Sequence, residues 1–261
     1  MAKNSYSYID NMNGKIIVFY GPDNQPGVTM VSKSCGEQLE KEGYNVLFLS
    51  ADRNGTCSYS NITFQNCLED TALLVQGCKD EKELFNTFNS QIISDGVTDM
   101  MPGLRNDFGR RNINEEFLPM MINQMKKIYD FIVIDGGTGS VEGLGKYALK
   151  SCNMLYIVTT QQEKSFERLF KILVEIKDNY PGNEGNIKYV FNKFNESRVF
   201  PNLNETAELL GCHRESLFKI EYVPFGWQAE KEKKTLLWNR KFMRGIKSIT
   251  GDILRGCMNE Y

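Results

Sequence analysis

The chain has 261 residues, 41% of them hydrophobic and 25% charged, with a formal net charge of −2. This composition fits one large α/β domain or two small ones, and the near-neutral charge excludes a global basic field for nucleic acid. No apolar run approaches the ~20 residues that a membrane span requires, and residues 1–13 contain no apolar signal-peptide core. Seven scattered cysteines without a CxxC pair indicate reduced, mostly buried thiols, so we expect a cytoplasmic protein.

The first 50 residues predict a β-loop-α-β unit. Residues 1–14 are polar and form a loose lead-in before an apolar strand at 16–20. A loop rich in Gly and Pro follows, and then a helix that begins at Thr29 and continues to about residue 42, where Gly43 ends it. Residues 46–49 form a second short apolar run, which is typical of a buried parallel strand.

Residues 56–112 carry the weakest patterns in the chain. Helices are predicted at 67–75 and 81–93, and residues 100–103 indicate a strand that runs into a turn. The segment 105–111 is a polar, partly basic loop. A further helix at 114–129 has apolar residues at helical spacing, which we expect to enter the core: Phe117, Met120, Met121, Met125 and Ile128.

The remaining sequence alternates between strands and helices without a Ser/Gly linker or an internal repeat. This alternation predicts one doubly wound, mainly parallel α/β sheet with helices on both faces, which forms a single domain at 15–261. The expected strands are 131–134, 154–158, 187–191 and 218–223, and the expected helices are 144–149, 166–176, 203–210 and 239–258. Because ligands of such sheets bind beyond the carboxyl ends of the strands, the loops that follow the strands are the place to look for chemistry.

The loop between the first strand and the first helix has the architecture of a phosphate-binding loop. Backbone N–H groups and the positive end of the helix dipole converge there on a point where an anion is favoured. In the Walker A form, G-x-x-x-x-G-K-[ST], Gly27 and Thr29 occupy the second glycine and the Ser/Thr positions. The lysine position holds Val28, and Pro22 stands in place of the first glycine. The scaffold of a nucleotide loop is therefore present without its main charge.

Several motifs in register resemble the MinD/ParA family of P-loop ATPases, and the resemblance covers nearly the whole chain. The deviant Walker A loop of that family has the pattern K-G-G-x-G-K-T-[ST]. Both lysines are replaced here, by Asp23 and Val28, whereas Gly27 and the Mg²⁺-liganding Thr29 remain. The resemblance implies that nucleotide binds along Asp23, Asn24, Gln25, Pro26, Gly27, Val28, Thr29 and Met30.

Further strand ends match the same family. Residues 46–55 fall on the family motif V-L-L-I-D-x-D-P-Q-G, with Ser50 in place of the first Asp and Asp52 as the second. By resemblance, Asp52 helps to position the attacking water and is the candidate catalytic residue. Asp135 is the Walker B acid, so Thr29 and Asp135 are the implied Mg²⁺ ligands. The residues expected beside the adenine base are Asn192, Pro224 and Phe225.

Each of these residues also has a purely structural interpretation. Thr29 is expected to cap the following helix, and Asp135 can cap the Gly-rich turn that follows it. For Asp52 the interpretation as a solvated turn residue beside Arg53 is favoured, whereas for Asn192 the adenine contact is favoured over a turn residue at a strand end.

The lost lysines decide the functional prediction. Phosphoryl transfer depends mostly on positioning and electrostatics, and the loss of one charged contact of this kind commonly costs ~10²-fold or more in rate. We therefore expect a MinD/ParA-like positioning or assembly protein, similar to the TadZ/CpaE branch that localises pilus-assembly machinery. It would be a homodimer that binds ATP or ADP with Mg²⁺ weakly or without efficient turnover.

Two alternatives stay open. One is an active ATPase of the same family in which Lys33, Arg105, Arg110 or Arg111 replaces the lost lysine. The other is an interaction scaffold or an unrelated doubly wound enzyme that binds no nucleotide at this loop.

The C-terminal segment 230–261 contains eight basic and four acidic residues, a net charge of +4. Its apolar residues Phe242, Ile246, Ile249 and Ile253 form one helical stripe, which predicts a terminal helix packed on the sheet with a solvated basic face. Alternatively, the helix contacts a membrane surface, as in MinD-like proteins, or nonspecific DNA, as in ParA-like proteins. Trp227 and Trp238 are expected in the core, with a role as anchors for a partner as the alternative. His213, the single histidine, is expected at the surface.

Overall fold

Eight strands form one sheet in the order β3-β4-β2-β5-β1-β6-β7-β8. The computed structural model describes residues 14–52, 59–60, 67–105, 113–114, 116–180, 187–196 and 202–258. Within these residues every neighbouring pair is parallel except β3–β4, which is antiparallel. The strands are β1 (Lys15–Gly21), β2 (Val46–Ser50), β3 (Ile93–Ser94), β4 (Asp99–Met101), β5 (Phe131–Thr138), β6 (Met154–Thr159), β7 (Ile187–Phe194) and β8 (Leu217–Glu221). The predicted mainly parallel sheet is confirmed.

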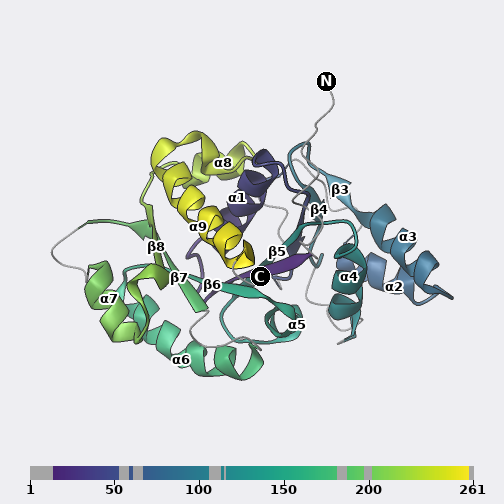
Figure 1. The fold of residues 1–261 in the computed structure, drawn as a ribbon, viewed down its shortest axis with the longest axis horizontal. Coiled ribbons are helices and arrows are strands. Elements are labelled where there is room, and N and C mark those ends of the chain that lie inside the picture. Colours follow the sequence, from purple (N-terminus) through teal and green to yellow (C-terminus); the bar gives the residue numbers. More distant parts are fainter. Residues whose placement is uncertain are drawn as a thin grey trace.

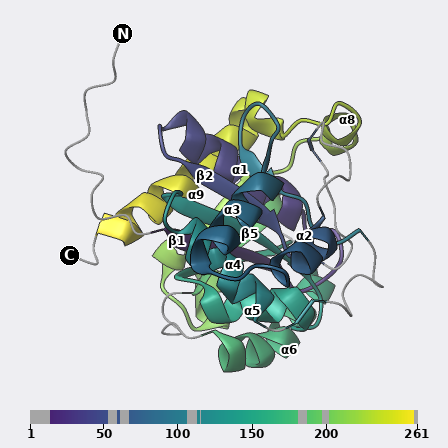
Figure 2. The same cartoon turned by 90° about the vertical axis from the view of Figure 1, so that its right-hand side faces the viewer.

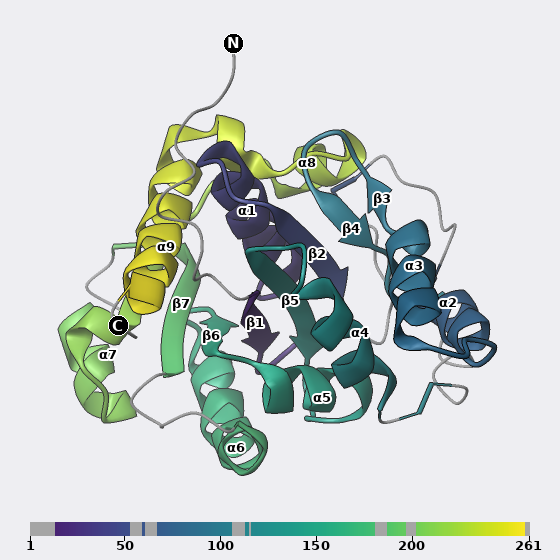
Figure 3. The ribbon, with the colours of Figure 1, turned by 45° about the vertical axis from the view of Figure 1, so that its right-hand side comes forward.

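Helices cover both faces of this sheet (Figures 1 and 2). The helices α1 (Val28–Lys41) and α9 (Arg240–Met258) lie on one face, and α4 (Phe117–Met125), α5 (Gly143–Ser151) and α6 (Glu163–Asn179) lie on the other. Figure 3 shows α2 (Leu68–Val75) and α3 (Glu81–Gln91) beside the β3–β4 end. The other helices of the described residues are α7 (Leu203–Leu210), α8 (Gly226–Lys231) and the short 3₁₀ turns η3 (Arg214–Ser216) and η4 (Leu236–Trp238).

The core divides into two apolar layers because successive residues of a strand point to opposite faces. Ile16, Val18 and Tyr20 of β1 enter the layer beneath α4, α5 and α6, whereas Ile17 and Phe19 enter the layer beneath α1 and α9. Strand β1 is buried on both sides, as expected of a central parallel strand. It lies between β5 and β6, so the loop after it opens at the middle of the carboxyl edge of the sheet.

Three predictions about helices α1 and α4 are wrong. Helix α1 begins at Val28 with Gly27 as its N-cap, so Thr29 is inside the first turn and does not cap the helix. Helix α4 is shorter than the predicted 114–129, because the chain after Met125 continues in tight i to i+3 turns. Ile128 in those turns is 39% exposed and does not enter the core.

The C-terminal helix confirms its predicted stripe. Phe242, Ile246, Ile249 and Ile253 are buried against the sheet and α1, whereas Trp227 and Trp238 are 70% and 53% exposed, so their predicted core position is wrong. His213 is exposed, as predicted. No helix in the described part of the chain is both long enough and apolar enough to cross a membrane. The predicted lead-in at 1–14, except for Gly14, and the loop residues Arg110 and Arg111 lie outside the described residues.

Candidate functional site

The loop from residue 22 to residue 27 is held in shape by strand β7. The Asn192 side chain donates from Nδ2 to the carbonyl of Pro26 at 2.8 Å, and Lys193 Nζ donates to the carbonyl of Gln25 at 3.0 Å. Gly27 has φ +93°, and a Cβ atom at this position would lie 2.4 Å from Asn192 Nδ2. A side chain at residue 27 is therefore excluded both by the backbone conformation and by Asn192.

Asp23 occupies the position of one family lysine, and its carboxylate is bound to helix α6. Ser165 Oγ donates to Asp23 Oδ2 at 2.9 Å, and Arg168 Nη1 lies 3.4 Å from the same oxygen. The Asp23 side chain is only 10% exposed. This arrangement ties the start of the loop to α6, and the positive charge of Arg168 is paired with the Asp23 carboxylate.

Thr29 and Asp135 meet at the start of helix α1. Thr29 Oγ1 donates to Asp135 Oδ2 at 2.6 Å, and the backbone N–H of Gly137 donates to Asp135 Oδ1 at 3.0 Å. Asp135 is fully buried, and burial raises its pKa to about 6. The bond from Thr29 opposes this rise, and the nearby negative charge of Asp52 adds to it. The two predicted metal ligands are thus brought into direct contact.

Asp52 follows β2 and lies next to the carboxyl end of β5. A Cβ atom added to Gly137 would approach Asp52 Oδ1 to 2.9 Å, so the left-handed glycine at φ +83° allows the two segments to meet. The Asp52 side chain is half-buried and lines the same cleft as Asp135.

These elements surround a cleft of about 920 Å³ at the carboxyl edge of the sheet, a volume within the range of small-molecule sites. It gathers residues 24–30, Asp52, Asp135, Asn192 and Pro224. Two predicted nucleotide-binding residues do not line it. Asp23 is bound to α6, and the ring of Phe225 packs on that of Trp238 with centroids 5.3 Å apart.

Positive charge is scarce in this cleft. Lys193 is the single cation among the described lining residues, which also include the carboxylates of Asp52, Asp135, Glu221 and Glu230. Because P-loop sites use lysine to neutralise phosphate charge, this wall is unfavourable for a triphosphate by itself.

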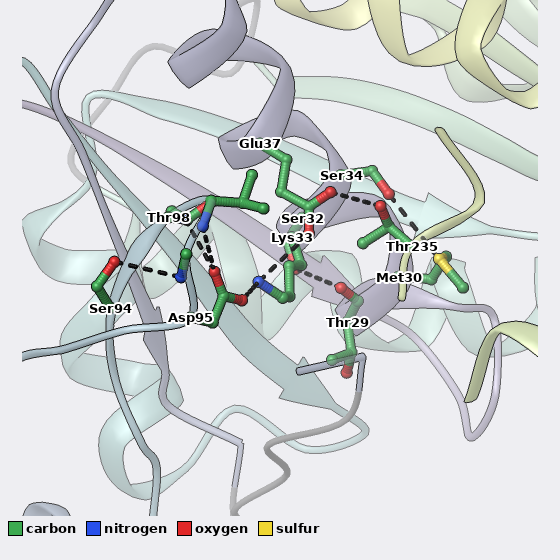
Figure 4. A network of polar contacts seen from close by, with 12 residues as sticks. Thr29, Met30, Ser32, Lys33, Ser34, Glu37, Ser94, Asp95, Thr98 and Thr235 are labelled. Carbon is green, nitrogen blue, oxygen red and sulfur yellow. Dashed lines mark hydrogen bonds and ion pairs between the residues drawn. The ribbon is translucent and has the colours of Figure 1, made fainter. Parts of the chain in front are cut away.

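Lys33 and Arg105, the described candidates for replacing the missing lysine, form ion pairs outside the cleft. Lys33 is fully buried, and its Nζ lies 2.5 Å from Asp95 Oδ2 and 3.3 Å from Glu37 Oε1 (Figure 4). Arg105 pairs with Asp70 of α2 at 2.6 Å. Neither residue lines the cleft.

The donor set fits a divalent cation better than it fits a bare phosphate chain. A hydroxyl and carboxylate oxygens, as supplied by Thr29, Asp135 and Asp52, are the ligands that Mg²⁺ prefers. The first N–H groups of α1 have no partner within the helix and remain suited to an anion. A nucleotide therefore fits here only together with the cation that offsets these carboxylates.

Sequence patterns missed part of the cleft wall. Tyr59, Tyr222, Trp227 and Glu230 line it without belonging to any motif. The six-residue helix α8 that carries Trp227 and Glu230 is too short to produce a periodic signal. Tyr222 and Trp227 lie close to Pro224 in the sequence, and this clustering of aromatic residues was the available sign.

Comparison with protein-family models and with the sequences of curated proteins finds no match. Solved structures do match. A ParA-family ATPase from Chlorobium tepidum superposes with a TM-score of 0.77 at 18% identity, over 90% of this chain and 98% of that one. MinD from Pyrococcus horikoshii, complexed with Mg-ADP, has a TM-score of 0.71 at 17% identity, over 92% and 96% of the two chains. A plasmid partition protein from Borrelia burgdorferi bound to AMPPNP has a TM-score of 0.66 at 16% identity, over 93% and 99%.

These likenesses confirm the fold that the sequence resemblance implied. The chain has the architecture of the ParA and MinD ATPases across nearly its whole length.

Proposed function

We propose that this chain is a positioning or assembly protein of the MinD/ParA type whose nucleotide site is degenerate. It binds ATP or ADP with Mg²⁺ weakly, or without efficient hydrolysis, and works as a homodimer at a membrane or cell-pole assembly, in the manner of the TadZ/CpaE proteins of pilus or secretion machinery. The observation that carries the proposal is a contrast within one site: the Thr29–Asp135 pair is retained, whereas the lysine positions hold Asp23 and Val28.

The residues that remain would take the following binding roles. Thr29 and Asp135 would hold Mg²⁺, which supplies the positive charge that the loop lacks. Gly27 lets the backbone approach a phosphate, and Asn192 fixes the loop through the carbonyl of Pro26. Asp52 lines the cleft and would orient a water molecule. Without a lysine to stabilise charge on the transferred phosphoryl group, this set supports binding better than turnover.

Steady-state ATP hydrolysis and calorimetric titration with ATP, ADP and Mg²⁺ test the proposal. We expect negligible turnover by the unmodified chain and Mg²⁺-dependent nucleotide binding that is weak or undetectable. Val28→Lys should strengthen ATP binding by about tenfold or more, because it restores a charged contact to the phosphates. Thermal unfolding of this variant controls for the burial of Val28.

Rapid Mg²⁺-dependent hydrolysis that Asp52→Ala abolishes would overturn the degenerate-site proposal. It would establish the active ATPase instead. A complete absence of nucleotide binding, even in Val28→Lys, would favour the plain scaffold.

The basic outer face of α9 is the surface we propose for an anionic partner, either a membrane surface or nonspecific DNA. Lys241, Arg244 and Arg255 have exposed side chains there, at 66%, 80% and 68%. The apolar stripe of the helix is buried, so contact through charge, which salt weakens, is favoured over insertion of the stripe into lipid. Liposome co-sedimentation and DNA retention at two salt concentrations distinguish the two partners.

A further inference from the structure

The carboxylate of Asp23 ends an ordered chain of hydrogen bonds that starts just after β6. Ser165 Oγ donates to Asp23 Oδ2, and the hydroxyl of Thr160 lies 2.8 Å from the same serine oxygen. A serine hydroxyl has one proton to donate, and Ser165 gives it to Asp23, so Thr160 is the donor to Ser165. Ser165 is 1% exposed, so its bond to the carboxylate forms away from bulk water.

Helix α6 also compensates the charge of this carboxylate. Ser165 lies in the first turn of α6, and the N-terminal end of a helix favours negative charge. Arg168, one turn further along, pairs with Asp23 Oδ2. Neither Asp23 nor Arg168 lines the cleft. The negative charge at residue 23 is therefore neutralised and held outside the cleft.

Strand β7 holds the rest of the loop. The carbonyls of Gln25 and Pro26 accept from Lys193 and Asn192 of that strand. Gln25 has φ +66°, a conformation that side chains other than glycine rarely adopt. The loop is thus fixed from two sides, by β7 through its carbonyl groups and by α6 through the side chain of Asp23.

An uncompensated carboxylate at residue 23 would oppose phosphate binding. The residues that follow it, 24–30, all line the cleft, so a phosphate bound along the loop would lie close to residue 23. Like charges repel most strongly at short range and away from water. A carboxylate can occupy this lysine position without preventing phosphate binding only if its charge is cancelled and its direction is fixed.

We propose that Ser165 and Arg168 are positioning residues for the phosphate site, which hold the Asp23 carboxylate against α6 and cancel its charge so that the loop still accepts a phosphate group. The inference rests on the proposed function, since it concerns phosphate binding at the same loop. It means that the replacement of a lysine by Asp23 leaves a neutral pair at the start of the loop and not a reversed charge.

Inorganic pyrophosphate with Mg²⁺ is the probe, because it tests the loop without the nucleoside. The full chain, labelled with ¹⁵N, is titrated while the amide chemical shifts of residues 27–30 are followed, a method that detects weak binding at a known place. We expect shifts at these residues that saturate. Amide signals far from the loop show in the same spectra whether each variant is folded.

Two variants of α6 test the positioning role. Arg168→Met should raise the dissociation constant for pyrophosphate about three- to tenfold, because Asp23 is left without its cation. Ser165→Ala should raise it at least about twofold, because the carboxylate loses the donor that fixes its direction. Lys171→Met is the matched control, since Lys171 is an exposed cation of the same helix and does not line the cleft. It should change the constant by less than about twofold.

A double-mutant cycle separates cancellation of charge from mere support of the loop. In an Asp23→Asn background there is no carboxylate charge to cancel, so Arg168→Met should change the dissociation constant by less than about twofold. A residue that only supported the loop would have the same effect in both backgrounds.

Three results would overturn the inference. They are an absence of saturable shifts in the unmodified chain, equal weakening by Arg168→Met and Lys171→Met, and an Arg168→Met effect that persists in the Asp23→Asn background. The proposed function is decided separately, by turnover and binding of ATP. Rapid ATP hydrolysis would remove the degenerate-site proposal and leave the role of Arg168 in place, whereas failure of the cycle would leave the slow turnover unexplained by nothing more than the lost lysines.

Discussion

Two successive turns of helix α1 show opposite uses of charge. The first turn presents Thr29 to Asp135 at the cleft and contains no cation. The next turn carries Lys33, a fully buried cation held by two carboxylates (Figure 4). A positive charge therefore lies one helical turn from the phosphate loop, but it serves the core and not the site.

The buried network around Lys33 fixes α1 from two sides. Asp95 belongs to the connection between β3 and β4 and accepts from the backbone N–H groups of Val97 and Thr98 at 3.0 and 2.9 Å. Glu37 accepts from Thr235 Oγ1, just before η4, at 2.5 Å. Because Lys33 links both carboxylates, the helix that starts at the phosphate loop is tied to the sheet edge and to the segment that follows α8. A cation with this structural role is not available to replace the missing lysine.

The largest effect should come from breaking this network. Lys33→Met leaves Asp95 and Glu37 buried without their cation, and removal of one partner from a buried pair typically costs about 3–5 kcal/mol. We expect a loss of that size in the free energy of unfolding, measured by urea denaturation.

Lys127→Met is the matched control, because Lys127 pairs with Glu81 at 2.6 Å but both side chains are largely exposed. It should cost no more than about 1 kcal/mol. If Lys33→Met were as mild as the control, Lys33 would be free to serve the loop and the active ATPase would regain support.

Much of the fold follows from local patterns. The apolar runs of β1, β5 and β6 are readable because a doubly buried parallel strand consists almost entirely of apolar residues. Strand β3 has only two residues and is defined by its antiparallel pairing with β4, so the local sequence does not predict it. The end of α4 was misplaced because helical spacing continues into turns that are no longer α-helical.

The site residues that could be predicted are those whose place follows from their position at the end of a strand. Parallel strands bring their carboxyl ends together, and this placed Asp52, Asp135 and Asn192 around one cleft. Thr29 was read as a cap because threonine favours that position, but its hydroxyl is taken by Asp135, 106 residues away. The partners of Asp23 and Lys33 are similarly distant in sequence. Sequence motifs do not predict side-chain contacts between residues so far apart in the chain.

A smaller effect should follow from the titration of Asp135, the acid on the cation-free turn. Its pKa in the folded chain is about 6, above the ordinary value of 3.8. The folded chain therefore holds this proton more tightly than the unfolded chain, and stability decreases as pH rises from about 4 to 6. The loss is at most about 3 kcal/mol.

Asp135→Asn cannot ionise and should lack this contribution. We expect the difference in unfolding free energy between the variant and the unmodified chain to grow in favour of the variant across that pH range, in metal-free buffer. A constant difference from pH 4 to pH 7 would show that the carboxyl is not desolvated as the structure indicates. Added Mg²⁺ should reduce the difference, because a cation stabilises the ionised carboxylate.

The smallest effect concerns the cation at the other end of the loop. Arg168 pairs with Asp23 at 3.4 Å, and its side chain is 42% exposed, so Arg168→Met should cost no more than about 1 kcal/mol of stability. Its consequence should be local: hydrogen exchange at residues 24–28 should become faster, because the loop then depends on Ser165 and β7 alone. Lys33→Met, in contrast, should accelerate exchange throughout α1. An Arg168→Met effect as large and as widespread would mean that both cations support the core, and the contrast between the two turns of α1 would no longer explain the charge of the loop.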